Sequence, residues 1–327
     1  MLSDQEFSQQ CARLACLAER ELVGPYAEEF TIHSARDLFD RLSTFDNCQW
    51  AFRGQADAEW HLQPSIERYA LKGFWNPQES WAFEEFKERA SRYTQDLGEP
   101  PTDCLAWLAT MRHFGGPTRL LDWTKDPHVA AFFAVSDPTT NDKASAVWAI
   151  NKAAITEEAD RLLSEPACEI QRPPSRIDGD HFTATFFGST WPPVVMPVEP
   201  SQPCGRQKEQ KGIFLCSNAT HWEYDFETCL KNVLQSGIER KERRLYKITV
   251  MPDLRDDVLT ELKRKGMSHE SLFPGLDGLG RSLAMDVSIR SEYFGHYYRN
   301  HPSTSISSSD ITEPCATSSQ PGSPSAG

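Results

Sequence analysis

The sequence lacks the long apolar segments and the excess of basic residues that would direct a protein to a membrane or to nucleic acid. No stretch approaches the 18 consecutive apolar residues of a membrane-spanning helix, and the opening MLSDQE has neither the basic start nor the apolar core of a signal peptide. Asp and Glu number 47 against 34 Lys and Arg, a formal net charge of −13, which opposes a global phosphate-binding field. We therefore expect a cytoplasmic protein without membrane or nucleic-acid partners, although a local basic pocket stays compatible with this charge.

Familiar catalytic and metal-binding motifs are also absent. The sequence contains no G-x-G-x-x-G, G-x-x-x-x-G-K-[ST], G-x-S-x-G or H-E-x-x-H pattern, the spacings typical of dinucleotide, phosphate-loop, hydrolase and zinc-protease sites. Nine cysteines are scattered without a C-x-x-C pair, so we expect reduced thiols. Cys204, Cys216 and His221 fit no zinc-ligand spacing. We therefore predict no metal site.

What the sequence does contain is an ordinary globular composition with clear helical and strand patterns. Of its 327 residues, 39% are hydrophobic and 25% charged, which excludes collagen, coiled-coil and wholly disordered chains. Helical spacing and capping signals predict helices over 7–22, 34–42, 76–97, 102–111, 126–134, 226–234, 253–265 and 276–287. Apolar runs predict strands over 48–53, 146–150, 183–187, 194–198, 213–216 and 245–250. Because strands and helices do not alternate regularly, the order favours an α+β fold with a small mixed or antiparallel sheet flanked by several helices.

Composition also divides the chain into three parts. We expect an N-terminal helical extension over 1–46 and a single folded domain over 47–290. The remainder, 291–327, becomes rich in Ser, Thr, Pro and Gly and nearly free of bulky apolar residues from His301 on. Such a segment cannot bury enough apolar surface to fold. We therefore predict a flexible Ser/Pro-rich C-terminal tail.

The first candidate site motif lies at the end of a predicted strand, where Arg53 is followed by Gly54 and Gln55. A guanidinium offers five donors in a flat fork, which suits a phosphate or a carboxylate, and a glycine beside it leaves the approach open. The alternative is that Arg53 pairs with a nearby carboxylate of the protein and holds the strand end in place.

The second motif is the sequence GGPTRLLDWT, which ends one predicted helix and leads into the next. It delivers Arg119, Asp122, Trp123 and Thr124 toward a helix N-terminus, where free amides and partial positive charge attract anions. Two alternatives stay open. Asp126 can itself cap those amides, and Arg119 and Asp122 can neutralise one another.

A third polar group directly precedes the strand predicted over 213–216. Glu209 and Gln210 stand at the mouth of that strand, within reach of a bound ligand. The alternative is that they are solvated polar residues flanking a buried strand.

Together these motifs resemble the FRG domain, a bacterial family named for the Phe-Arg-Gly triplet found here at 52–54. The resemblance also includes Gln55, Trp60, Pro64-Ser65, Arg68 and the segment 116–124, which is the most specific motif. Later segments, 210–214 and 272–279, are similar to further motifs of the family, so the resemblance spans roughly 50–287.

A weaker resemblance links the aromatic-Arg-Gly triplet to ADP-ribosyltransferase-like folds, in which that Arg helps to hold NAD. It implies that Arg53 contacts the phosphate or ribose of NAD and that Gln210 stands near the position of a catalytic Glu. The chain departs from this pattern because glutamine cannot ionise, and Glu209 points the other way on an extended segment. A neutral amide still hydrogen-bonds a ribose hydroxyl, which is compatible with binding without turnover.

Two functional hypotheses follow. The first is a pocket for a nucleotide-like anionic ligand, with NAD as the candidate substrate and ADP-ribose transfer or glycosidic-bond cleavage as the candidate chemistry. Its ligand-binding residues are Arg53, Gln55, Arg119, Trp123 and Thr124, and its candidate catalytic residues are Asp122, Glu209 and Gln210. The second is a non-enzymatic sensor or protein-interaction module whose Arg and Asp residues form a structural polar network. Enzymatic activity and any protein target stay open at this point.

Overall fold

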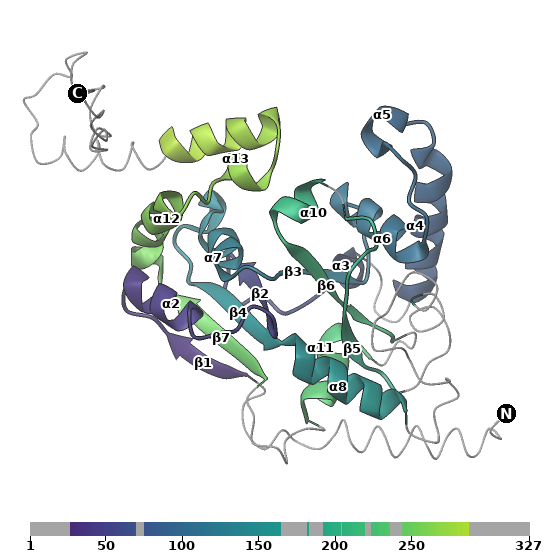
Figure 1. Cartoon of the computed structure of the whole chain (residues 1–327), viewed down its shortest axis with the longest axis horizontal. Helices are drawn as coiled ribbons and strands as arrows, with labels where there is room; N and C mark the ends of the chain where they lie inside the picture. Colours follow the sequence, from purple (N-terminus) through teal and green to yellow (C-terminus); the bar gives the residue numbers. More distant parts are fainter. Residues whose placement is uncertain are drawn as a thin grey trace, which may run out of the picture. The chain divides into compact units, whose positions relative to one another are not determined.

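The computed structural model describes residues 27–69, 75–164, 182, 192–203, 205–219, 224–235 and 244–287, and the structure is discussed for these residues (Figure 1). The chain divides into two compact units, Met1–Ser282 and Leu283–Gly327. The helix predicted over 7–22, the strand predicted over 183–187 and the tail predicted over 291–327 lie outside the described residues.

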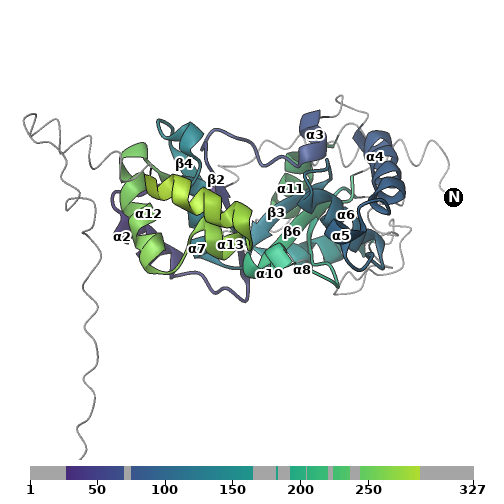
Figure 2. The same cartoon turned by 90° about the horizontal axis from the view of Figure 1, so that it is seen from above.

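Seven described strands form one mixed sheet in the first unit (Figures 1 and 2). They are β1 (Glu28–Thr31), β2 (Trp50–Gln55), β3 (Leu120–Thr124), β4 (Ser145–Asn151), β5 (Val195–Val198), β6 (Gly212–Ser217) and β7 (Leu245–Val250). Their order is β1-β7-β4-β2-β3-β6-β5. The β1–β7 pair is parallel, and the other neighbours are antiparallel. The predicted α+β class with a mixed sheet is confirmed.

Helices surround this sheet, and several begin at the capping residues that the sequence predicts. The helices are α2 (Ala35–Leu42), α3 (Ser65–Tyr69), α4 (Trp75–Ala90), α5 (Thr94–Leu97), α6 (Cys104–His113), α7 (Pro127–Val135), α8 (Lys152–Leu163), α10 (Gly205–Glu209), α11 (Phe226–Gln235), α12 (Arg255–Arg264), α13 (His269–Leu272) and a helix over 276–287. Short 3-10 turns, η1 (Pro138–Thr140) and η3 (Pro252–Leu254), complete the set. Ser34 accepts a hydrogen bond from the amide of Asp37, and Asp126 accepts one from the amide of His128, which satisfies amides that a helix start leaves free.

One face of the sheet packs directly against α7, and Gly54 makes this contact possible. A Cβ at position 54 would lie 2.0 Å from the carbonyl oxygen of Ala130 and 2.5 Å from the amide nitrogen of Ala134. No side chain fits between strand and helix at this point, because such distances lie far inside van der Waals contact. The structure therefore gives this glycine a packing role, whereas the sequence suggested that it opens the approach of a ligand.

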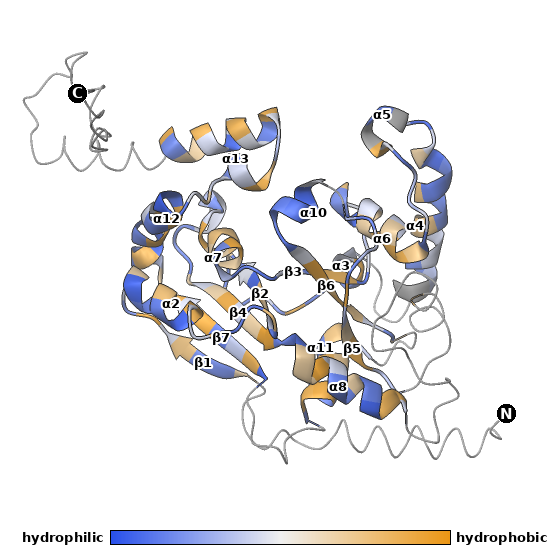
Figure 3. Ribbon diagram, viewed as in Figure 1, coloured by the Kyte–Doolittle hydropathy of each residue, from blue (hydrophilic) through white to orange (hydrophobic). Residues whose placement is uncertain are grey.

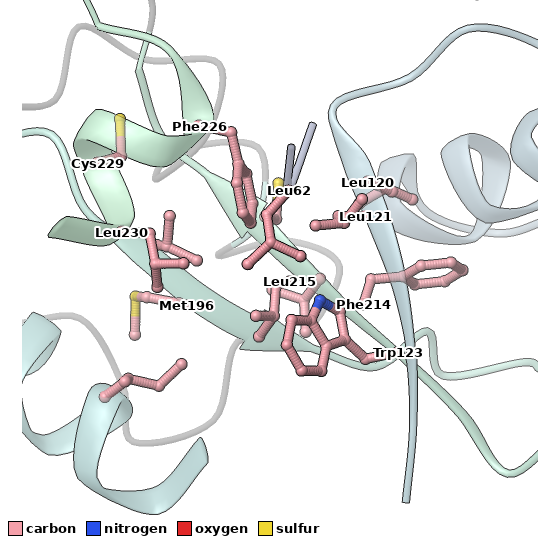
Figure 4. Packing of buried hydrophobic residues seen from close by; sticks show 14 of the residues in the cluster. Leu62, Leu120, Leu121, Trp123, Met196, Phe214, Leu215, Phe226, Cys229 and Leu230 are labelled. Carbon is pink, nitrogen blue, oxygen red and sulfur yellow. The ribbon is translucent and has the colours of Figure 1, made fainter. Parts of the chain in front are cut away.

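The apolar core cluster includes residues of the central strands and of α8 and α11, and these two helices contact β5. Trp123 of β3 and Leu215 of β6 lie here beside Phe226 and Leu230 of α11 (Figure 4). Apolar residues concentrate on the central strands and on α7, whereas α2 and α12 carry polar outer sides (Figure 3). Burial of this apolar surface is the main driving force for the fold.

Three sequence-based expectations differ from the structure. The helix predicted over 76–97 breaks after α4, and the side chains of Trp81 and Tyr93, expected on its inner face, are exposed. Residues 120–124, expected to lie in a connection between helices, form the central strand β3. In the closing helix over 276–287, the four apolar residues of the predicted stripe are exposed: Leu276, Leu279, Leu283 and Val287.

The segment 28–42, expected within a separate N-terminal extension, is part of the sheet and its helical cover. β1 pairs with β7 from Glu28↔Tyr246 to Thr31↔Thr249, and α2 contacts α12. α2 and β2 belong to the same compact unit, and the domain boundary at residue 46 stays a prediction.

Candidate functional site

Arg53 lies where two central strands of the sheet part. β2 pairs with β4 along its whole length, but its register with β3 consists of the single pair Phe52↔Thr124. Just beyond this pair, Nη1 of Arg53 donates a hydrogen bond to the carbonyl oxygen of Asp122 at 2.6 Å. The guanidinium therefore links the two strands at the point where their backbone pairing ends (Figure 1).

Arg112 reaches the same residue from the end of α6. The helix ends near His113, and Gly115 adopts a φ of +84°, a conformation that glycine reaches without steric cost. The chain then returns as β3 and brings Asp122 back to Arg112. Nε and Nη2 of Arg112 donate to Oδ2 of Asp122 at 3.0 and 2.5 Å.

The Asp122 carboxylate is only partly engaged by the protein. Its side chain is 47% exposed, and that of Arg112 is 21% exposed. Both side-chain hydrogen bonds of Asp122 within the described residues use Oδ2, and no donor from this part of the chain contacts Oδ1. The Nε atom of Arg53 is buried and has no acceptor among the described residues. One acceptor of Asp122 and one donor of Arg53 thus stay unused within the described residues.

The pKa values around Asp122 reveal further charges close to it. Burial lowers the pKa of Arg53 to about 10, and the positive charges of Arg112 and Arg68 act in the same direction, while Asp122 opposes them. Burial alone would raise the pKa of Asp122, but Arg112, Arg53 and Arg206 outweigh it, so this pKa lies below its usual value. At neutral pH Arg53 is a cation and Asp122 is an anion.

We call these residues the Asp122 cluster: Asp122 with Arg53, Arg68, Arg112 and Arg206. Four guanidinium groups and one carboxylate give a local charge of +3, in a chain whose formal net charge is −13. The cluster draws side chains from β2, α3, α6, β3 and α10. Segments that are distant in the sequence therefore create a local basic site, which the overall composition left possible.

Arg68 and Arg206 of the cluster differ in the contacts that hold their side chains in position. Arg68, in the last turn of α3, is exposed and makes no hydrogen bond or ion pair within the described residues. Arg206, in α10, places its guanidinium carbon 4.2 Å from the centroid of the Phe273 ring, a cation–π contact that holds it in position. Arg68 is thus a free, solvated cation, whereas Arg206 is partly fixed.

Arg119 lies apart from this cluster. It forms an ion pair with Glu79 of α4 in which the side chains are 1% and 0% exposed. The backbone amide of Arg119 donates to one carboxylate oxygen of Glu79 at 2.6 Å, and Nε donates to the other at 2.5 Å. Asp122, which we considered as a partner of Arg119, pairs with Arg112. The structure therefore brings Arg53 and Asp122 together and leaves Arg119 in the interior.

Two further predicted ligand-binding residues are also buried. Gln55 donates through Nε2 to the carbonyl oxygen of His61 at 3.1 Å and accepts from Nε1 of Trp148 at 2.6 Å. Trp123 lies in the apolar cluster, and its indole nitrogen has no partner among the described residues (Figure 4). Their surroundings indicate packing roles, and their contact with a ligand stays a prediction.

Thr124 and Gln210 hold the end of β3 against the segment before β6. The hydroxyl of Thr124 donates to the backbone carbonyl of Gln210 at 2.7 Å and accepts from the amide of Asp126 at 3.0 Å. Nε2 of Gln210 donates to the carbonyl oxygen of Leu272 at 3.0 Å. Glu209 is exposed at the end of α10. Because Asp126 caps α7, the amides at this helix start already have a carboxylate of the protein beside them.

Sequence reasoning assigned no site role to Arg112, Arg206 or Glu79. A signal for Arg112 exists, since a helix that ends at the GGP turn and returns as a strand places residues on either side of that turn opposite one another. The partners of Arg206 and Glu79 could not be predicted, because their positions depend on elements that are distant in the sequence.

The described residues show neither a metal centre nor a membrane span. They contain no group of three or more His, Cys, Asp or Glu side chains that could hold a metal ion. None of the helices in this part of the chain combines the length and the apolar character needed to cross a bilayer. The four cysteines described, Cys48, Cys104, Cys216 and Cys229, form no disulfide.

Fold and site together define an α+β protein with a cluster of arginines at the parting of two central strands. Residues 48–143 match the family model described as the FRG domain, which confirms the resemblance over these residues. The matched range includes Arg53, Arg68, Arg112 and Asp122 of the cluster, whereas Arg206 lies outside it. No curated protein and no solved structure matches the chain.

Proposed function

We propose that the Asp122 cluster binds a nucleotide-like anionic ligand, with NAD as the candidate substrate. The observation that supports this most strongly is the gathering of four guanidinium groups in the Asp122 cluster, with Arg53, Arg112 and Arg206 close to the half-exposed carboxylate and Arg68 close to Arg53. Like charges at short range repel one another, and the repulsion is relieved when an anion binds among them. Guanidinium groups also match phosphate oxygens geometrically through paired hydrogen bonds.

If the site is catalytic, the charges of the cluster suit the breaking of a glycosidic bond. Arginines would hold the phosphates, while the ionised Asp122 would stabilise the positive charge that develops on the ribose ring as its base departs. Water as the acceptor gives hydrolysis, and a protein side chain as the acceptor gives ADP-ribose transfer. Glu209 and Gln210 stay candidates for assisting this step, but the exposure of Glu209 and the Gln210–Leu272 hydrogen bond favour them less than Asp122.

A second candidate function is a non-enzymatic sensor or protein-interaction module. Two contacts favour it: Arg53 donates to the Asp122 carbonyl, and Arg112 pairs with the Asp122 carboxylate. Both join elements of the fold and would persist without a ligand. In this case the arginines form a structural network, and a partner protein rather than a nucleotide meets the exposed charges.

Arg68→Ala tests ligand binding with little risk to the fold, since Arg68 has no hydrogen-bond or ion-pair partner among the described residues. NAD and ADP-ribose are titrated calorimetrically into the full chain, and release of nicotinamide is followed by chromatography. A charge-assisted hydrogen bond contributes about 1.5–3 kcal/mol, so we expect the variant to bind each probe at least about tenfold more weakly. Arg36→Ala, which removes the same charge from exposed Arg36 in α2, is the matched control and should bind normally.

No heat of binding with either probe would reject nucleotide binding, and equal affinities for Arg68→Ala and Arg36→Ala would reject the Asp122 cluster as the binding site. Arg53→Ala then separates the two candidate functions. A loss of stability without any change in ligand affinity supports the structural network. A loss of affinity in a folded variant supports the ligand site.

A further inference from the structure

We infer that Oδ1 of Asp122 accepts a hydrogen bond from a sugar hydroxyl of the ligand, so that the site selects ribonucleotides over phosphate compounds that lack this hydroxyl. The inference rests on the proposed function and names the part of the ligand that decides specificity. It starts from the unequal use of the two carboxylate oxygens of Asp122.

The carboxylate is held in a fixed orientation by one of its oxygens. Nε and Nη2 of Arg112 both donate to Oδ2, and the carbonyl oxygen of the same residue accepts from Arg53. Backbone and side chain of Asp122 are thus both anchored. Oδ1 receives no hydrogen bond within the described residues, although the side chain is 47% exposed. A fixed, accessible and unused acceptor is suited to accept a hydrogen bond from a donor group of a ligand.

The charge of the site restricts what that donor is. An ionised carboxylate only accepts hydrogen bonds, so a phosphate oxygen next to Oδ1 would be repelled. An ammonium group is equally unsuitable, because the positive charges of Arg112, Arg53 and Arg206 act on the same carboxylate and like charges repel. A neutral donor satisfies both conditions. In a ribonucleotide, the ribose places neutral hydroxyls on the same ring as the phosphate that the arginines would bind.

Arginines and carboxylate therefore divide the recognition of one ligand. Arg53 and Arg68 supply positive charge, and the exposed Arg68 also supplies donors that a ligand can reach. Asp122 supplies the acceptor. Inorganic phosphate can use only the first part of this arrangement, and an uncharged nucleoside can use only the second. A ribonucleotide uses both, which predicts that its hydroxyls contribute to affinity separately from its phosphate.

The test compares AMP with 2′,3′-dideoxy-AMP on the full-length protein by calorimetric titration. The two probes share the phosphate and the base, including its amino group, and differ only in the ribose hydroxyls. Leaving the charged acceptor without its donor costs on the order of tenfold in affinity or more, so we expect the dideoxy compound to bind at least about tenfold more weakly. Equal binding of the two probes would overturn the hydroxyl inference and leave the nucleotide proposal intact, whereas no binding of either would overturn both.

Two variants locate the effect. Asp122→Asn should abolish most of the discrimination between the probes, since it replaces the charged acceptor with an amide. Arg68→Ala should weaken both probes by the same factor and leave their ratio unchanged. A ratio that survives in Asp122→Asn places the hydroxyl contact elsewhere and rejects the assignment. If Asp122→Asn does not fold, the comparison of the two probes on the unmodified protein still decides the question.

Discussion

Two arginine–carboxylate pairs each include one residue of the GGPTRLLDWT motif, and they differ in exposure and in hydrogen bonding. Arg119 and Glu79 are 1% and 0% exposed, and both oxygens of the Glu79 carboxylate accept hydrogen bonds from Arg119. Arg112 and Asp122 are 21% and 47% exposed, and one oxygen of Asp122 is unused. An ion pair alone therefore does not identify a site. Exposure and unsatisfied hydrogen-bonding capacity distinguish the second pair from the first.

The buried pair is best understood as a connection between α4 and the entrance to β3. Removing two charges from water costs several kcal/mol for each ion, and only close pairing with further hydrogen bonds offsets this cost. Glu79 meets this requirement because it accepts from both the backbone and the side chain of Arg119. Arg119 of the GGPTRLLDWT motif thus supports the fold, and Asp122, three residues later, is the residue exposed to solvent.

Glu79→Ala should have the largest effect on stability. The variant leaves the Arg119 guanidinium buried without a counter-charge, for which a loss of about 3–5 kcal/mol is typical. Urea unfolding followed by circular dichroism measures the difference. Glu84→Ala, on the exposed side of the same helix, is the control and should change stability by less than about 0.5 kcal/mol. A loss below about 1 kcal/mol in Glu79→Ala would mean that the buried pair does not support the fold as we describe.

The same comparison explains how much of the fold local sequence predicted. Helices α2 and α7 carry capping residues and apolar spacing within their own segments, so Ser34 and Asp126 locate their starts. β3 was not predicted, because its apolar residues do not alternate with polar ones. It also directly follows the GGP turn, so the segment resembles a loop that connects two helices. β1 is short and polar at Glu28 and Glu29, and its place at the sheet edge depends on pairing with β7, more than two hundred residues away.

The candidate site was predictable to a similar extent. Arg53 and Asp122 were singled out because a guanidinium at a strand end and a carboxylate near a helix start are locally visible patterns, and the structure brings them together. The partners of Asp122 and Arg119 were assigned differently, since pairing depends on tertiary packing. Arg119 meets a carboxylate 40 positions away, and sequence alone gives no reason to prefer it over a nearer one.

A third carboxylate, Glu67, is half-buried and forms no ion pair within the described residues. Oε1 accepts from the amide of Phe226 at the start of α11 at 2.9 Å. Burial raises the pKa of Glu67 to about 8; the Phe226 amide opposes this, and the charges of Asp225, Glu227 and Glu79 add to it. Glu67 thus shows what a buried carboxylate does without the partner that Glu79 has, because it retains its proton at neutral pH.

Glu67→Gln should remove a pH dependence of intermediate size. The folded state binds this proton more tightly than the unfolded state, in which the pKa of a glutamate is about 4.3. Between about pH 4.3 and 8 this glutamate ionises in the unfolded state but keeps its proton in the folded state, so wild-type stability falls progressively over this range and the loss is complete above it. Glutamine keeps the acceptor for Phe226 and does not ionise, so the variant should gain about 1–3 kcal/mol relative to wild type across this range. Urea unfolding at a series of pH values measures the difference; a constant difference at all pH values would contradict the raised pKa.

Asp122→Ala should have the smallest effect on stability, and its size decides between the two interpretations of the cluster. Because both side chains of the Arg112–Asp122 pair are reached by water, Arg112 stays solvated when its partner is removed, and we expect a loss of no more than about 1 kcal/mol that shrinks further at high salt. Asp40→Ala, which removes an exposed carboxylate paired with Arg36, is the control and is measured by the same urea unfolding. If Asp122→Ala instead destabilises the protein as much as Glu79→Ala, the cluster is a structural network like the buried pair, and the charges proposed to bind a nucleotide are needed to hold the strands together.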